Sequence, residues 1–565
     1  MEREKIKEKI QNMSEDKLRT LCLKIIDFID EKQLEQIDAI LYEENSEDRA
    51  AVILKNTEKR MSQQFVDEKM EQIQNIFRDI EEEELYLEAN GYEDYSMGYW
   101  DSEWIWEYED SMGIGSKLTF AADFAEDCIK DKRYKEALAV LEQILEINVT
   151  AMTEMDPITL DLIDLNEEGI INFNLTRFAL NILYAKYQIS APEKRAADLY
   201  TYFTYSVFRD IHMEDILERG REELKGLDRF WNDWISLLET KQGNTESRLL
   251  REAAFCYGGE DGLAQVARRN FKTHPSISLA VMEEYQKSHS YEEMLDFAPK
   301  ALEEIDRNLK IRGQIAEKAA LAASYEERRD DVRRFCYEAF CSNKDVRSYL
   351  RLFGEREMAD TYGNKADEDI KSAKIKSANQ YENNSLQFYA GEFKRIKEKC
   401  KNPPNSLGWT GKFIRTGINL FLVYLYEGIK PGKAVNAIAG QIGFSDMANK
   451  DDYLTFETEI YQECTLHKVS IFWNYFQRWK QHTYMEQKEK EKYLSWIEKI
   501  IYHRADAIVG GKFRDHYGKT ALLLAALGEV KESLGYKGAK AAIQAEFKRK
   551  YPRHSAFQGA MRSWM

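Results

Sequence analysis

Residues 131–148 read DKRYKEALAVLEQILEIN. The apolar side chains of this stretch recur at steps of three and four residues: Tyr134, Ala137, Leu138, Leu141, Ile144 and Leu145. That spacing places them on one face of an α-helix. The rest of the chain agrees, because its 565 residues include only 8 Pro and 29 Gly, while residues that favour helices are abundant. The sequence therefore predicts an all-α fold.

A similar pattern returns at residues 290–305, with Tyr291, Leu295 and Leu302 on one face. Both stretches resemble the second half of a tetratricopeptide (TPR) unit, in which a small residue such as Ala137 allows close helix approach. The two copies do not recur at a fixed period of 34 residues, so the array is degenerate. A chain of 565 residues is too long to fold around a single hydrophobic core. We therefore expect an α-solenoid of degenerate TPR-like helix pairs with a C-terminal helical domain.

Changes in composition divide the chain into four predicted segments. Residues 1–110 are expected to hold N-terminal helical hairpins, the first capped by Ser14, and an acidic-aromatic segment. Residues 111–362 form the TPR-like repeat region. Residues 363–405 are a charged linker or irregular connection that ends at a Pro-Pro pair. Residues 406–565 form the C-terminal helical domain with a basic tail.

Charge and cysteine content indicate the kind of protein and its compartment. A net charge of −18 disfavours non-specific attachment to nucleic acid or anionic lipid. The 7 cysteines are scattered without a Cys-x-x-Cys pair, which is typical of reduced thiols in the cytoplasm. The most apolar stretch, residues 417–429, is about 13 residues long, whereas crossing a bilayer takes about 20. We therefore expect a cytoplasmic protein with no membrane partner.

The acidic-aromatic segment, residues 79–110, contains 13 acidic residues, no Lys or Arg, and 8 Tyr or Trp. Such alternation can mark a disordered recognition segment. Trp100, Trp104 and Tyr108 also fall on one helical face, and the interpretation favoured here is a partly ordered helix whose aromatic side chains pack on neighbours. The candidate protein-binding residues are Tyr99, Trp100, Trp104 and Trp106.

The C-terminal tail has the opposite charge. Residues 501–565 contain 12 Lys and Arg against 5 Asp and Glu. Lys548, Arg549, Lys550 and Arg553 cluster as phosphate ligands would, which makes them candidate nucleic-acid-binding residues. The interpretation favoured here is a charged cap that shields the last apolar face of a helical array from water, and the nucleic-acid contact is the alternative.

Two apparent motifs lack residues that their chemistry requires. Residues 511–520 read GKFRDHYGKT, but a phosphate-binding loop needs its first Gly at the position of Phe513. We expect instead a turn at Gly510 and Gly511 that enters a helix ending at Gly528. Cys336 and Cys341 have no nearby His, and no His-x-x-x-His pair occurs. The sequence thus predicts no metal, no cofactor and no catalytic residue.

Four places resemble the long helical region of bacterial SWIM zinc-finger proteins. They are the acidic-aromatic segment with residues 133–138, residues 345–352, residues 407–411 before the apolar helix, and the tail from Arg504 through Tyr517 to residues 553–557. The SWIM finger itself requires Cys-x-Cys followed by Cys-x-His, and the sequence contains neither. The resemblance therefore implies association with other proteins and no defined chemistry.

Together these observations predict a non-enzymatic helical-repeat scaffold or adaptor whose partner is another protein. One alternative is an accessory subunit of a nucleic-acid-processing or defence complex that contacts RNA or DNA through the basic tail. A second alternative is a hydrolase, because its site residues need to meet only in space.

Overall fold

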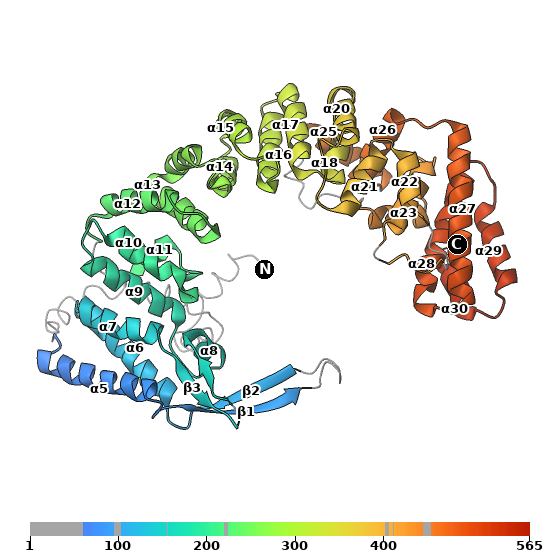
Figure 1. The fold of residues 1–565 in the computed structure, drawn as a ribbon. Helices are drawn as coiled ribbons and strands as arrows, with labels where there is room; N and C mark the ends of the chain where they lie inside the picture. The colour runs from blue at the N-terminus through green and yellow to red at the C-terminus, as the bar shows by residue number, and fades with distance from the viewer. Residues whose placement is uncertain are drawn as a thin grey trace, which may run out of the picture. The chain divides into compact units, whose positions relative to one another are not determined.

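A computed structural model of the chain describes residues 60–94, 103–154, 156–219, 224–401, 406–410, 412–443 and 454–564. In these ranges the protein is mostly helical, which confirms the predicted predominance of helices (Figure 1). The predicted N-terminal hairpin that begins at Ser14 lies outside the described residues. The chain divides into two compact units, residues 1–189 and 190–565, and each is described by itself.

Unit 1 is built from a helical layer and a small sheet. Its helices are α5 (Gln63–Glu81), α6 (Ile114–Lys130), α7 (Tyr134–Leu145), α8 (Leu162–Glu167) and α9 (Leu175–Ile189). Helix α7 contacts α5, α6 and α9. Its predicted apolar face is buried, including Ala137, Leu138 and Leu141. Arg133, just before α7, donates to the Met61 carbonyl at 2.8 Å and to Asp131 at 2.9 Å, so the start of α5 is fastened to the α6–α7 turn.

The sheet is the part of the fold that the sequence prediction missed. Its strands are β1 (Leu87–Asp94), β2 (Glu103–Glu109), β3 (Val149–Met152) and β4 (Ile158–Leu160), in the order β2-β1-β3-β4. Strands β1 and β2 are antiparallel, as are β3 and β4, while β1 and β3 are parallel. The fold is therefore not strictly all-α.

The helix predicted within residues 79–110 is wrong where the structure describes it beyond α5, because β1 and β2 lie there. Trp104, Trp106 and Tyr108 alternate with Ile105, Glu107 and Glu109. This two-residue period puts the first set on one face of a strand, and aromatic and β-branched residues favour strands. Trp104 and Tyr108 are also four residues apart, which is the spacing of one helical face, so the sequence pattern is compatible with a helix as well.

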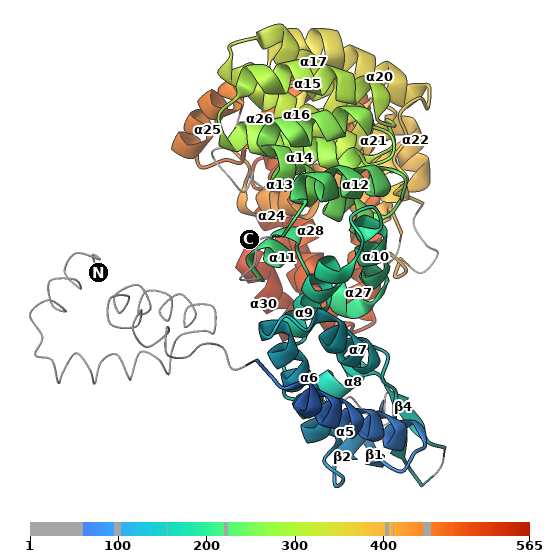
Figure 2. The same ribbon diagram turned by 90° about the vertical axis from the view of Figure 1, so that its left-hand side faces the viewer.

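Unit 2 begins with short elements followed by a run of longer helices. They are α10 (Arg195–Tyr200), η1 (Thr201–Thr204), η2 (Ser206–Phe208), α11 (Met213–Arg219), α12 (Leu227–Glu239), α13 (Asn244–Arg269), α14 (Pro275–Lys287), α15 (Tyr291–Glu304), α16 (Lys310–Tyr325) and α17 (Arg329–Asn343). From α12 to α17 each helix packs on the next, and α14 also packs on α16. Figure 2 shows α14 to α17 side by side. The second TPR-like stretch of the sequence forms α15.

The remainder of unit 2 is also helical. Its elements are α18 (Val346–Arg351), α19 (Arg356–Met358), η3 (Ala359–Gly363), α20 (Asn364–Lys371), α21 (Gln380–Tyr389), α22 (Phe393–Lys399), α23 (Ile414–Leu425), α24 (Lys433–Gln441), α25 (Thr455–His467), α26 (Ile471–His482), α27 (Gln487–Gly510), η5 (Arg514–His516), α28 (Tyr517–Ser533), α29 (Ala539–Lys550) and α30 (Ser555–Trp564). The charged interval 363–405 thus contains α20, α21 and α22. The apolar stretch of the sequence forms α23, which is buried from Gly417 to Leu425 and packs on α21, α22, α24, α27 and α28.

Candidate functional site

The β1–β2 hairpin presents an aromatic face. Cross-strand partners place Gly91 opposite Trp106 and Glu93 opposite Trp104. The rings of Trp104 and Trp106 meet edge to face with centroids 5.9 Å apart. A Cβ on Gly91 would lie 2.3 Å from Nε1 of Trp104 and 2.8 Å from a ring carbon of Trp106. Glycine at this position therefore allows both indoles to rest on the strand backbone.

Both faces of the hairpin keep large apolar side chains in contact with solvent. Trp104 is 50% exposed, and on the opposite face Tyr92 is 47% and Ile105 36% exposed. Strand β2 is an outer strand of the sheet. Glu88, Glu107 and Glu109 lie on the same face as Tyr92 and Ile105, while Glu93 lies opposite Trp104, in a segment without Lys or Arg. The hairpin is therefore an aromatic, negatively charged edge.

The hairpin has a firm base. At the end of β2, the Asp110 carboxylate accepts hydrogen bonds from the backbone N–H groups of Ile114 at 2.7 Å and Gly115 at 2.8 Å, at the start of α6. A Cβ on Gly115 would lie 1.8 Å from the Ile170 carbonyl oxygen. The Asp110 hydrogen bonds and the close approach of Gly115 to Ile170 together fix the position of the end of β2 relative to the start of α6.

Two of the four predicted protein-binding residues can be placed. Trp104 is exposed and Trp106 is half-buried, and both lie on the aromatic face. Tyr99 and Trp100 lie outside the described residues.

The predicted nucleic-acid-binding residues lie at the end of α29 and just beyond it. Lys548, Arg549, Lys550 and Arg553 are all exposed. Lys550 forms an ion pair with Asp506 at 2.6 Å, and the Tyr551 hydroxyl donates to the same carboxylate at 2.9 Å. Phe557, which follows these residues, is fully buried and contacts Phe547 and Tyr517. Within the tail, α29 and α30 both pack on α28, the four basic side chains stay exposed, and Phe557 belongs to the core.

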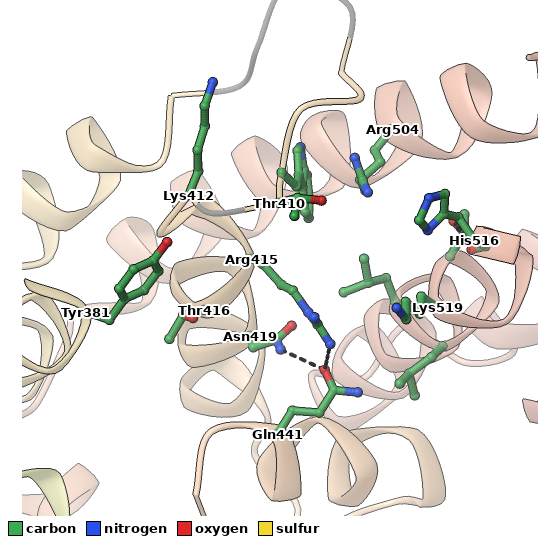
Figure 3. Close-up of a pocket in the computed structure, with 14 residues that line it drawn as sticks. Tyr381, Thr410, Lys412, Arg415, Thr416, Asn419, Gln441, Arg504, His516 and Lys519 are labelled. Atoms are coloured by element: carbon green, nitrogen blue, oxygen red, sulfur yellow. Dashed lines mark hydrogen bonds between the residues drawn. The ribbon is translucent and has the colours of Figure 1, made fainter. Parts of the chain in front are cut away.

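A cationic cavity lies elsewhere in unit 2, among α21, α23, α24, α27 and α28 (Figure 3). Its volume is about 340 Å³. Lys412, Arg415, Arg504, His516 and Lys519 line it, and no Asp or Glu does. This is a local reversal of charge in a chain whose net charge is −18.

Arg504 is held in place by uncharged groups. Its Nη1 donates to the carbonyls of Ser406 at 2.9 Å and Leu407 at 3.0 Å. Its guanidinium carbon lies 4.3 Å from the centroid of the buried Trp409 ring system. Burial, followed by the nearby charge of Arg415, lowers the pKa of Arg504. Two guanidinium groups thus face one cavity and repel each other.

A polar cluster forms one wall of the cavity (Figure 3). Gln441 Oε1 accepts from Arg415 Nη2 at 3.2 Å and from Asn419 Nδ2 at 3.3 Å. Asn419 is only 2% exposed, and its Oδ1 has no hydrogen-bond partner in the described part of the chain. A buried acceptor without a partner costs free energy, commonly about 1–3 kcal/mol.

Residues 511–520 differ from the sequence prediction and contribute to this cavity. Helix α27 continues through Gly510, and α28 begins at Tyr517 and runs past Gly528 to Ser533, so the predicted helix end at Gly528 is wrong. Gly528 lies inside this helix, where its missing side chain makes room for Lys540, whose Cα would lie 2.8 Å from a Cβ at that position. Lys519, in the first turn of α28, lines the cavity.

Among the described residues, neither a metal site nor a reactive thiol stands out. Within the described ranges, no three His, Cys, Asp or Glu side chains gather as a metal ion would require. Burial raises the pKa of Cys128, Cys336 and Cys400 to about 12. These thiols are therefore protonated near neutral pH, the state in which a thiol is a poor nucleophile. No helix among the described residues combines the length and apolar character needed to cross a bilayer.

Comparison with known proteins gives no relative: no protein-family model, no curated protein and no solved structure matches the chain.

Proposed function

We propose that the protein is a non-enzymatic helical scaffold that binds another protein through the β1–β2 hairpin. The observation that carries this proposal is the exposure of Trp104, Tyr92 and Ile105 on a hairpin whose outer strand is an edge. An unprotected edge strand is a template for pairing with another chain, and exposed aromatic side chains are typical anchors of protein interfaces.

The chemistry of the hairpin selects an extended, positively charged partner segment. Such a segment adds a strand beside β2 through main-chain hydrogen bonds. Its Lys or Arg side chains approach Glu107 and Glu109 on one face of the hairpin, and the apolar side chains that alternate with them cover the exposed indole of Trp104 on the other face. The indole supplies a large apolar surface for that contact.

The helices of unit 2 support the scaffold part of the proposal. From α12 to α17 each helix packs on its neighbour in sequence, and α14 also packs on α16. An α-solenoid of degenerate TPR-like pairs would pack in this nearest-neighbour manner, so the contacts support that part of the proposal. Such a stack offers a long binding surface and needs no catalytic pocket.

The first prediction tests the hairpin with a defined probe, a peptide that alternates Lys and Val, against the same peptide with Glu replacing Lys. The full chain should bind the Lys peptide and not the Glu peptide. Trp104→Ala combined with Trp106→Ala should weaken binding at least tenfold, or about 1.4 kcal/mol. Titration calorimetry measures the affinity.

Tyr536→Ala is the matched control, because Tyr536 is also 50% exposed but lies in unit 2, and it should leave the affinity unchanged. Circular dichroism checks the fold. Equal binding of both peptides, or a double variant that binds normally, rejects the proposal. A double variant that loses helix content would show that these aromatic residues belong to the core, and the hairpin would then not be the binding site.

A further inference from the structure

We propose that the cationic cavity of unit 2 binds a small phosphate ester whose body carries a hydroxyl or amino group. This inference is independent of the scaffold proposal, because every residue it uses lies between Tyr381 and Leu523 in unit 2.

The charges that line the cavity lack counter-charges. Arg415, Arg504, Lys412 and Lys519 form no ion pair with any described carboxylate, and none of the lining residues is acidic. Basic side chains elsewhere in the unit are commonly paired, for example Lys531 with Glu498 at 2.6 Å and Lys540 with Glu529 at 2.9 Å. Cations that line one cavity without carboxylates attract an anion of more than one charge.

One of these cations is held in position by the protein itself. Arg504 is fixed by two carbonyls and by Trp409, so little side-chain entropy is lost when it binds an anion. Guanidinium groups suit phosphate because they present several N–H donors in one plane. Lys519 adds a charge in the first turn of α28, a helix whose N-cap residue His516 makes no capping side-chain hydrogen bond. Because His516, Lys519 and Thr520 at the start of α28 line the cavity, the positive end of that helix dipole lies beside it.

Asn419 shows what else the ligand must carry. Its Nδ2 is engaged by Gln441, while its buried Oδ1 lacks a donor among the described residues. Phosphate oxygens only accept hydrogen bonds when ionised, so they cannot satisfy this atom. A hydroxyl or amino group next to the phosphate does. A cavity of about 340 Å³ is within the range of small-molecule sites, and nucleoside and sugar monophosphates have this combination of groups.

The test measures binding of separate probes to the full chain by titration calorimetry and thermal shift. The probes are inorganic phosphate, adenosine monophosphate, glucose 6-phosphate, the parent adenosine and glucose, and a 12-nucleotide RNA. We expect at least one of the two monophosphates to bind more tightly than inorganic phosphate and to raise the melting temperature. The parent compounds should not bind. The comparison of the two monophosphates identifies the body that the cavity prefers.

Variants locate the site. Arg415→Gln and Lys519→Gln remove exposed charges and should each weaken ester binding about tenfold, as loss of a charge-assisted hydrogen bond does. Arg562→Gln and Lys537→Gln are matched controls outside the cavity and should change affinity less than twofold. Asn419→Leu should reduce the affinity for the ester and leave that for inorganic phosphate unchanged.

Three results would overturn the proposal. The first is the absence of any heat or thermal shift with either monophosphate at millimolar concentration. The second is ester binding that survives both Arg415→Gln and Lys519→Gln. The third is binding of the RNA alone, which would make the cavity part of a nucleic-acid contact. If Asn419→Leu does not fold, the two charge variants still decide the outcome.

Discussion

Glu457 is fully buried, and two neighbouring side chains donate hydrogen bonds to its carboxylate. Its Oε1 accepts from Arg351 Nε at 2.7 Å and from the Tyr475 hydroxyl at 2.6 Å. The pKa of Tyr475 is raised, first by burial and then by the charge of Glu457, so the hydroxyl stays protonated and donates. Three helices, α18, α25 and α26, meet at this one carboxylate.

Removal of the cation should therefore be costly. Arg351→Met leaves Glu457 buried with its charge unpaired, which typically destabilises a protein by about 3–5 kcal/mol. We expect a lower urea midpoint for the transition of unit 2. In the double variant Arg351→Met with Glu457→Leu, most of the loss should be recovered, because both charges are gone. Urea denaturation followed by circular dichroism measures both. A single variant as stable as the parent would mean that the pair contributes nothing.

Helix α24 owes its start to a side chain from a distant element. The Glu529 carboxylate of α28 accepts from the backbone N–H groups of Ala434 at 3.1 Å and Val435 at 2.9 Å. A Cβ on Gly432 would lie 2.4 Å from Glu529 Oε2, so the glycine makes room for this cap. The cap matters for the cavity, because α24 carries Gln441.

Glu529→Leu should loosen α24 while α28 stays folded. The variant leaves two backbone donors without an acceptor, at a cost of about 1–3 kcal/mol. Hydrogen exchange of residues 434–441 should become faster, while exchange in the middle of α28 stays slow. Glu532→Leu, one turn along the same helix, is the control and should leave residues 434–441 protected. Unchanged exchange in Glu529→Leu would contradict this role of the carboxylate.

Helices and hairpin differ in how far local sequence determines them. The pattern of Tyr134, Ala137 and Leu138 identifies α7, because a helix is specified by residues three and four apart. The hairpin residues Trp104 and Tyr108 satisfy both a helical and a strand spacing. The choice between them is made by pairing of β1 with β3, a long-range contact that no local pattern contains. The cationic cavity is hidden for the same reason, since Lys412, Arg504 and Lys519 come from separate segments.

The exposed charges of the tail have little effect against the charge of the full chain. Its net charge is −18, and Lys550 is already paired with Asp506. We therefore expect no measurable binding of duplex DNA at physiological salt in a fluorescence anisotropy titration. If binding is found, the logarithm of the association constant should fall against the logarithm of the salt concentration with a slope of about 0.9 per phosphate contact. Charge reversal at Lys548 and Lys550 should then flatten that slope by about two units.

The parallel pairing of β1 with β3 has a consequence for the order in which unit 1 assembles. Leu87 pairs with Ala151 and Glu88 with Met152, and both α6 and α7 lie between these partners in the chain. The hairpin of β1 and β2 can form early because its contacts are local, but two strands alone are marginally stable in water. It is anchored only after the two intervening helices bring β3 to β1, since loop closure precedes the gain from distant contacts. Until β3 is in place, the aromatic side chains of the hairpin lack part of their support, and exposed apolar surface of this kind makes a folding intermediate prone to aggregation.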